Sequence, residues 1–185
     1  MAKGSRGGKR GGGGGNINQT EKDAVFEYTT SKFQQINGGL RKGENLSKTN
    51  QNIVDNIDSA INKSTLDANT VLYRGTSPEA LGISKDIKKM TAQEVKDLVG
   101  KNYTDKAFLS FSKEKSASNT FSGRGEYKGN VEITLQTKGK RKGLDVGDNS
   151  NFGAGESEVI LPRNANLKIV SAKRYLNKLS ITVEY

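Results

Sequence analysis

The order in which two kinds of hydrophobic pattern follow one another most constrains the fold of this chain. Apolar residues recur at helical spacing at 20–40, where Thr20 is a candidate N-cap, and again at 47–62. Thr91 and Glu94 form a capping-box pattern that predicts another helix start, and 113–120 also fits a helix. Short segments rich in β-branched and aromatic residues predict strands at 71–74, 107–112, 131–136, 156–161, 167–172 and 179–185. Helices first and strands afterwards predict an α+β fold with a mainly antiparallel sheet.

The 185 residues suggest one domain preceded by a short tail. Residues 1–15 are almost entirely Gly, Lys, Arg and Ser, so we expect a flexible tail at 1–18 and a folded domain at 19–185. The net charge is +10, and four positive charges lie in the tail at Lys3, Arg6, Lys9 and Arg10, which leaves +6 for the rest. A basic body suits an anionic cofactor or target. The tail either contacts nucleic acid or acidic surfaces nonspecifically or is simply solvated.

Three residue types are missing from the sequence, which has no His, no Cys and no Trp. A serine–histidine triad, a thiol nucleophile, a disulfide framework and an ordinary zinc site are therefore excluded, and we expect no metal. Any catalysis must use carboxylates, Arg, Lys, Ser, Thr, Tyr or a borrowed cofactor. The apolar runs are far shorter than the roughly 20 residues that cross a bilayer, and the N-terminus lacks a secretory pattern. We therefore expect no membrane association and a cytoplasmic location, in the producer, a host or a target cell.

Three short elements carry residues suited to chemistry. Glu156 and Glu158 stand at i and i+2, which on a strand puts both carboxylates on one face, about 6–7 Å apart. The element 71–75 ends an apolar strand with Arg74, a good phosphate fork, followed by Gly75, which lets a ligand approach the backbone. Ser110 and Ser112 place two hydroxyls on one strand face. Taken singly, the Glu156 and Glu158 pair also fits a solvent-facing strand, Arg74 also fits a surface ion pair, and the two serines also fit an ordinary amphipathic strand.

Taken in order, the three elements resemble the R–S–E signature of the mono-ADP-ribosyltransferase exoenzyme family, which includes binary toxins that modify actin. Residues 28–41 are similar to the family helix of the form Y-[ST]-x-x-x-[YF]-x-x-I-N-x-x-L-R, whose aromatic and Asn positions approach NAD. In this chain those positions are Tyr28, Phe33 and Asn37. Phe121 and Arg124 match a family loop in which an aromatic ring packs on nicotinamide and an arginine meets the cofactor phosphate. The resemblance covers about residues 24–161.

The resemblance implies a two-sheet α+β core and an enzyme of the glycosyltransferase class that uses NAD as co-substrate, without a metal. ADP-ribose would pass to arginine side chains of target proteins, and nicotinamide would be released. Glu158 would act on the ribose 2′-hydroxyl and the developing charge, with Ser110 bracing it, while Arg74 would hold the pyrophosphate and Gly75 would meet the carboxamide. Glu156 would orient the acceptor guanidinium. The NAD-binding set implied is Tyr28, Phe33, Asn37, Arg74, Gly75, Ser110, Ser112, Phe121 and Arg124.

Two departures and two alternatives accompany this interpretation. Phe111 stands where the family often has Thr, and Phe152 lies six residues before Glu158, whereas the family's target-recognition aromatic usually lies five before. The same fold could instead modify RNA or DNA, to which the basic tail would steer it, or the chain could be an inactive basic binding module. Small single-domain transferases of this kind occur as bacterial toxins, effectors and phage-encoded enzymes, and we expect a monomer.

Overall fold

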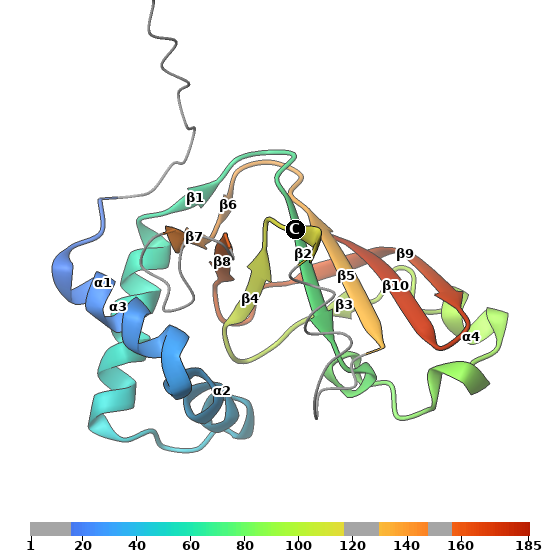
Figure 1. The fold of residues 1–185 in the computed structure, drawn as a ribbon, viewed down its shortest axis with the longest axis horizontal. Helices are drawn as coiled ribbons and strands as arrows, with labels where there is room; N and C mark the ends of the chain where they lie inside the picture. Colours follow the sequence, from blue (N-terminus) through green and yellow to red (C-terminus); the bar gives the residue numbers. More distant parts are fainter. Residues whose placement is uncertain (1–15, 117–129, 148–156) are drawn as a thin grey trace, which may run out of the picture.

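The computed structural model describes residues 16–116, 130–147 and 157–185, and Figure 1 shows its helices gathered at the two ends of a twisted sheet. The N-terminal helices are α1 (Gln19–Glu27), the π-helical turn η1 (Tyr28–Lys32), α2 (Phe33–Lys42) and α3 (Lys48–Asn62). At the other end lie two short 3-10 turns, η2 (Pro78–Leu81) and η3 (Ile87–Lys89), and α4 (Ala92–Lys96). Of the tail predicted at 1–18, residues 1–15 lie outside the described residues, whereas Asn18 caps α1.

The first predicted helix is divided in the structure. Its N-cap is Asn18 rather than Thr20, because Asn18 and Glu21 form a reciprocal capping box. The helix is then interrupted at Thr30, whose ψ of −146° is not helical, and the wider turn η1 joins α1 to α2. The later starts are as predicted, with Ser47 capping α3 and Thr91 capping α4. The interruption begins at Tyr28, which is one of the predicted NAD-binding residues.

Eight strands form a mixed sheet in the order β3-β9-β10-β5-β2-β4-β8-β7, and β1 and β6 form a separate antiparallel pair. All pairs in the eight-stranded sheet are antiparallel except β10 with β5. The strands are β1 (Thr65–Leu66), β2 (Val71–Thr76), β3 (Asn102–Tyr103), β4 (Leu109–Ser112), β5 (Val131–Gln136), β6 (Arg141–Lys142), β7 (Leu144–Asp145), β8 (Glu158–Leu161), β9 (Leu167–Tyr175) and β10 (Lys178–Glu184). This architecture confirms the predicted α+β class with a mainly antiparallel core.

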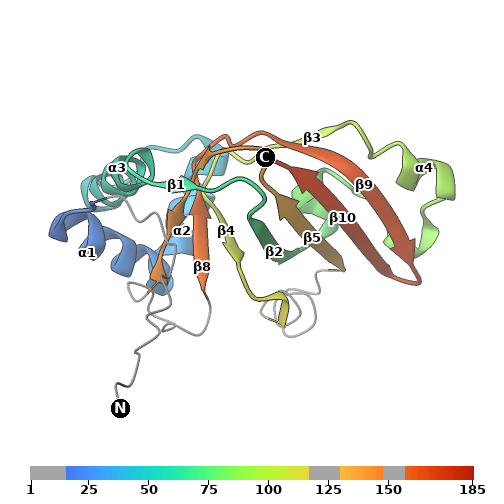
Figure 2. The same cartoon turned by 90° about the horizontal axis from the view of Figure 1, so that it is seen from above.

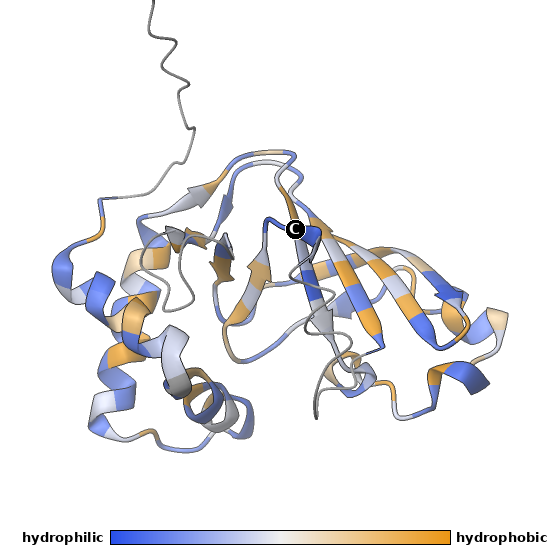
Figure 3. Ribbon diagram, viewed as in Figure 1, coloured by the Kyte–Doolittle hydropathy of each residue, from blue (hydrophilic) through white to orange (hydrophobic). Residues whose placement is uncertain are grey.

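Two hydrophobic cores lie against this sheet, because its strands alternate apolar and polar side chains (Figure 3). One core joins β2, β5, β9 and β10 to the segment that contains η3 and α4, and includes the buried Leu72, Ile133 and Ile181. The other joins helices α1–α3 to Phe108 and to Ile160 of β8. Figure 2 shows the two helical groups on either side of the strands. In the part of the chain that the structure describes, no helix is long and apolar enough to span a membrane.

Strand β8 is buried on both faces, which fixes the direction of its side chains. Val159 and Leu161 belong to the first core, whereas Ile160 belongs to the helical core. Strands β2 and β4, in contrast, share a single residue pair, Tyr73 with Ser112, so the sheet opens between them. The candidate site lies at this opening.

Candidate active site

Three neighbouring strands bring the predicted Arg, Ser and Glu residues together. Ser112 of β4 pairs with Tyr73 of β2 on one side and with Glu158 of β8 on the other. Arg74 reaches across the opening, where its Nη1 donates a 2.7 Å hydrogen bond to the carbonyl oxygen of Ser110. The order Arg, Ser, Glu along the chain therefore becomes a row of adjacent strands in space.

The polar residues of β4 and β8 lie on the face of the sheet that the helices cover. Residues two apart on a strand share a face, so Glu158 lies on the same side as Ile160, which packs in the helical core. Ser110 pairs with Ile160 and Ser112 pairs with Glu158, so both serines lie on that side as well. All three side chains are only partly buried. This face thus presents two hydroxyls and a carboxylate at the end of the helical core.

Tyr28 and Asn37 bring the N-terminal helices into the same cluster. Tyr28 is 1% exposed, and its ring packs edge-on against Phe108 with ring centroids 5.6 Å apart. Its hydroxyl accepts a 2.8 Å hydrogen bond from Asn37 Nδ2. The wider turn η1 interrupts the helix at this point, and α2 begins after it. Asn37 lies on α2 and comes within hydrogen-bonding distance of the tyrosine. The kinked helix thus joins two of the predicted NAD-binding residues directly.

The electrostatics of Tyr28 connect it to the strand residues. Burial raises the pKa of its hydroxyl to about 12, partly offset by the Asn37 hydrogen bond. The negative charge of Glu158 raises this pKa further, whereas Arg74 and a hydrogen bond with Ser110 lower it. Tyr28 is therefore neutral at ordinary pH and can donate or accept a hydrogen bond beside the Arg–Ser–Glu row.

Arg74 has hydrogen-bonding capacity that the described residues do not use. Its Nε and the nearby Tyr103 hydroxyl are both buried, and neither has a well-formed hydrogen-bond partner within the described residues. Burial raises the pKa of Tyr103, and the Arg74 guanidinium acts in the opposite direction, as expected for close neighbours. Since buried polar groups normally have partners, this arrangement indicates a place where an anionic ligand could accept hydrogen bonds.

A second arginine, for which no role was predicted, stabilises this region through an ion pair. Arg41 at the end of α2 binds Asp105 through Nε and Nη2, and the Nη2 contact is 2.8 Å. Burial lowers the pKa of Arg41, but the ion pair with Asp105 raises it above its ordinary value overall. Asp105 also accepts a 2.9 Å hydrogen bond from the backbone N–H of Ala107. Only the last position of the helix pattern at 28–41 pointed to Arg41, and no signal pointed to Asp105 or Tyr103.

The Glu-x-Glu element differs from the predicted strand. β8 begins at Glu158, not at residue 156, and Ser157 has a φ of +42°. The shared strand face of the two carboxylates stays a prediction, because the left-handed Ser157 interrupts the pleated alternation before Glu158. Ser157 is held in place, since its carbonyl accepts a 3.1 Å hydrogen bond from Lys113 N. Glu156 itself lies outside the described residues.

The remaining predicted residues are placed unevenly. Gly75 lies in β2 opposite Glu132, and Phe33 begins α2 with 36% of its surface exposed. Phe121 and Arg124 lie outside the described residues, as does Phe152. Arg74, Ser110, Ser112, Glu158, Tyr28 and Asn37 are thus the predicted residues that the described structure brings together.

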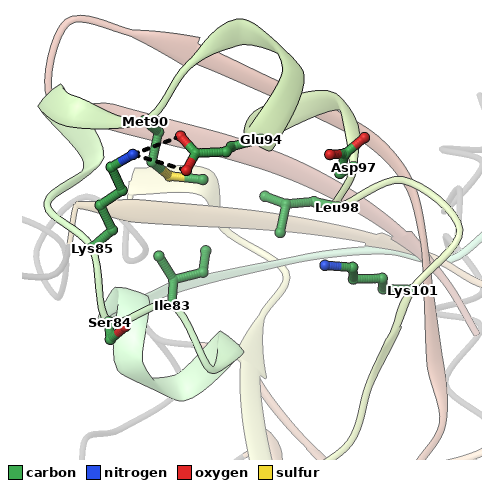
Figure 4. A pocket seen from close by; sticks show the side chains of 8 residues that line it. All are labelled: Ile83, Ser84, Lys85, Met90, Glu94, Asp97, Leu98 and Lys101. Carbon is green, nitrogen blue, oxygen red and sulfur yellow. Dashed lines mark hydrogen bonds and ion pairs between the residues drawn. The ribbon is translucent and has the colours of Figure 1, made fainter.

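A shallow pocket of about 250 Å³ lies elsewhere, between the η2–η3 segment and α4 (Figure 4). Lys85 and Glu94 pair across it with a 2.8 Å contact, while Asp97 and Lys101 add one charge of each sign. None of the predicted site residues within the described chain lines it. Its balanced charges do not favour an anionic cofactor, so the cluster of Arg74, Ser110 and Glu158 remains the better candidate.

The family comparison decides the identity of the fold. The sequence model described as "ADP-ribosyltransferase exoenzyme" matches residues 12–184. The chain belongs to this family. It is therefore an ADP-ribosyltransferase, and the family resemblance drawn from the motifs is confirmed. A search of curated proteins found no match for the transferase.

Solved structures of bacterial toxins share the fold of the transferase at low sequence identity. A C3-type ADP-ribosyltransferase from Clostridium botulinum superposes with a TM-score of 0.75 at 22% identity, covering 92% of this chain and 88% of that chain. The Clostridium limosum C3 exoenzyme gives 0.74 at 23% identity, with 91% and 86% covered. A C3-type protein from S. aureus, solved with NAD, gives 0.70 at 21% identity, with 91% and 87% covered. The likeness extends over nearly the whole transferase.

Proposed function

We propose that the transferase cleaves NAD at the bond between nicotinamide and ribose and transfers ADP-ribose to arginine side chains of target proteins. The observation that carries the proposal is the convergence of Arg74, Ser110 and Glu158 from three adjacent strands around the buried Tyr28 hydroxyl. We further propose that residues 19–185 form the catalytic domain and act as a monomer, without a metal, in a cytoplasm.

The chemistry of the donor set fits NAD. Arg74 has a buried Nε with no well-formed partner among the described residues, and a guanidinium can bind pyrophosphate oxygens through two parallel hydrogen bonds. The S. aureus protein, which shares the fold, was solved with NAD. Gly75 would meet the carboxamide at the backbone of β2, and Phe33, Asn37 and Ser112 would belong to the NAD-binding set. Phe121 and Arg124 would complete the NAD site from the segment that follows β4.

The proposed step is glycosyl transfer. The bond from ribose C1′ to the pyridinium nitrogen breaks, and its electron pair leaves with nicotinamide, so positive charge develops on the ribose. Glu158 stabilises this charge and holds the 2′-hydroxyl, while Ser110 braces the carboxylate. The acceptor guanidinium nitrogen then bonds to C1′ and loses one proton. Glu156 takes up that proton after orienting the guanidinium.

The test is an assay with labelled NAD and a bacterial lysate, in which nicotinamide release and label transfer are measured separately. Glu158→Gln should abolish both activities, because it removes the charge that stabilises the ribose. Glu156→Gln should abolish transfer and leave some NAD hydrolysis. Glu184→Gln, on β10 at the other end of the sheet, is the matched control and should change neither. A Glu158→Gln protein with full transfer activity would overturn the proposal.

A nucleic-acid acceptor is the second candidate, favoured by the net charge of +6 that remains after the tail is set aside. The same assay separates the two acceptors. Label removed by protease supports a protein, whereas label removed by nuclease supports RNA or DNA. A wild-type protein that releases no nicotinamide in any lysate would instead be an inactive binding module, although Arg74 and Glu158 are both present.

A further inference from the structure

The β9–β10 hairpin carries an unusual apolar tip. Tyr175 is 78% exposed and Leu176 is 69% exposed, more than any other large hydrophobic side chain of the described residues. The hairpin is internally braced, because Arg174 Nη1 donates to the carbonyl oxygen of Leu176 at 3.2 Å. The tip therefore exposes two large apolar side chains on a turn that a hydrogen bond stabilises, as protein contact surfaces do.

The backbone of Leu176 adds a second observation. Its φ is +55°, a left-handed conformation that Gly and Asn adopt easily and that costs a bulky residue steric strain. Asn177 follows it, so the sequence places leucine at the strained position although an amide residue stands next to it. Leu176 buries little surface against its own chain. The fold gains nothing from leucine here, which indicates a role in contact with another molecule.

The hairpin tip lies at the end of the sheet toward which β2 runs from Arg74 to Thr76. Thr76 at the end of β2 pairs with Val131, Val131 pairs with Leu179, and Leu179 pairs with Arg174. This row crosses four strands, so the tip lies roughly 15–20 Å from the backbone of β2 at Arg74. Glu158 lies two strands beyond β2, at the end of β8 that faces away from the tip, so a macromolecule could contact both places, whereas NAD alone could not.

The surroundings of the tip are basic. Among the described residues of the hairpin, of η3 with its N-cap and of the start of β5, the cations are Lys88, Lys89, Lys173, Arg174 and Lys178, and the acids are Asp86 and Glu132. Glu132 is already paired with Lys178 at 3.2 Å, and η3, which carries Lys88 and Lys89, packs against β10. The surface around the two apolar side chains therefore has an excess of positive charge, which complements an acidic partner.

We propose that the tip formed by Tyr175 and Leu176, with its basic surround, is the docking surface for the acceptor protein. It would bind an acidic face of that protein, with the two side chains filling an apolar hollow. This inference rests on the proposed function, since it assumes that ADP-ribose passes to a protein. The tip supplies affinity for the acceptor and takes no part in cleaving NAD, so the two roles separate experimentally.

The test compares Tyr175→Thr and Leu176→Asn with a matched control, Val71→Thr. Val71 is 39% exposed and lies at the opposite end of β2. Asn relieves the strain at position 176, so the melting temperature of Leu176→Asn should equal or exceed that of the wild type. Three activities are measured: NAD hydrolysis, transfer to a small guanidino compound, and transfer to the labelled protein acceptor in a membrane-free lysate.

We expect each tip variant to raise the KM for the protein acceptor about tenfold while changing the other two activities less than about twofold. Lys173→Glu should also raise this KM, with the larger effect at low salt. An unchanged KM, an equal loss of all three activities, or the same effect in Val71→Thr would overturn the docking role. Label found on nucleic acid would also overturn the docking role. So would binding of the wild type to anionic phospholipid vesicles, if that binding depends on Leu176 and transfer to the protein acceptor does not. A wild type that releases no nicotinamide would refute the proposed function instead.

Discussion

The Tyr28 hydroxyl joins the helices to the candidate site, and Tyr28→Phe tests that junction. The phenylalanine keeps the edge-on contact with Phe108 but removes the acceptor of the 2.8 Å bond from Asn37 Nδ2. Only a long 3.5 Å contact with the Phe108 carbonyl would remain for that amide, which is 7% exposed. A buried donor without a partner costs about 1–3 kcal/mol. We expect the free energy of unfolding to fall by about 2 kcal/mol at pH 7.5, and the melting temperature by about 4–8 °C.

The pH dependence of this loss gives a sharper test. Tyr28 has a pKa of about 12 in the folded protein against 10.0 as its ordinary value, so the folded state holds this proton more tightly than the unfolded state. Wild-type stability should therefore fall as pH rises above 10, by about 1 kcal/mol at pH 11, about 2 kcal/mol at pH 12 and about 3 kcal/mol in total at still higher pH. Tyr28→Phe lacks this group, so its deficit should shrink by about 1 kcal/mol between pH 7.5 and 11. Tyr103 and Tyr185 titrate in both proteins and cancel in the comparison.

Urea unfolding at pH 7.5 and 11 measures both effects. Asn37→Leu in the Tyr28→Phe background is the control, because removing both partners of a buried hydrogen bond costs less than removing one. The double variant should recover about 1 kcal/mol relative to the sum of the two single changes. A deficit that stays constant with pH, or additive single changes, would refute the proposed coupling between these side chains.

Two further predictions concern stability. Gly38→Ala should stabilise α2 by about 0.5–1 kcal/mol, since no neighbouring atom lies within 4 Å of the added Cβ. Gly143→Ala should cost about 1–3 kcal/mol, because its Cβ would lie 2.6 Å from Leu66 Cδ1, and thermal unfolding that ranks the pair in the opposite order would contradict this packing. Burial raises the pKa of Glu21, but its hydrogen bonds, led by the one with Lys63, lower this pKa below 4.5 overall. The ionised Glu21 therefore contributes stability above pH 4.5, and this contribution is lost as the pH falls. Glu21→Gln should therefore be less stable at pH 7 and show a flatter acid decline in urea unfolding, whereas parallel pH profiles would show that the ion pair contributes nothing.

The parts of the fold that local interactions determine could be predicted from the sequence. The Thr91 capping box acts on backbone groups three residues away, and α4 begins where that cap predicts, while α3 begins within one residue of the predicted start at 47. The strand at 131–136 was predicted with both ends correct, because its side chains alternate cleanly between core and surface. The Arg, Ser and Glu residues were predicted from their resemblance to a known family pattern, and the structure places them on adjacent strands.

The parts that depend on distant contacts could not be predicted. The helical pattern at 20–40 gave no sign of the break at Thr30, which brings Tyr28 and Asn37 together. The left-handed backbone at Ser157 is set by hydrogen bonding to the Lys113 region rather than by its own sequence. Asp105 binds an arginine 64 residues away, a pairing that no local pattern contains.

Nicotinamide release by the purified protein shows whether the Arg74, Ser110 and Glu158 cluster cleaves NAD. The measurement needs no knowledge of the acceptor, because hydrolysis uses water in its place. The wild type and the Glu184→Gln control should release nicotinamide at equal rates, while Glu158→Gln should lower the rate by at least about 100-fold. Equal rates in Glu158→Gln and the wild type would contradict the account.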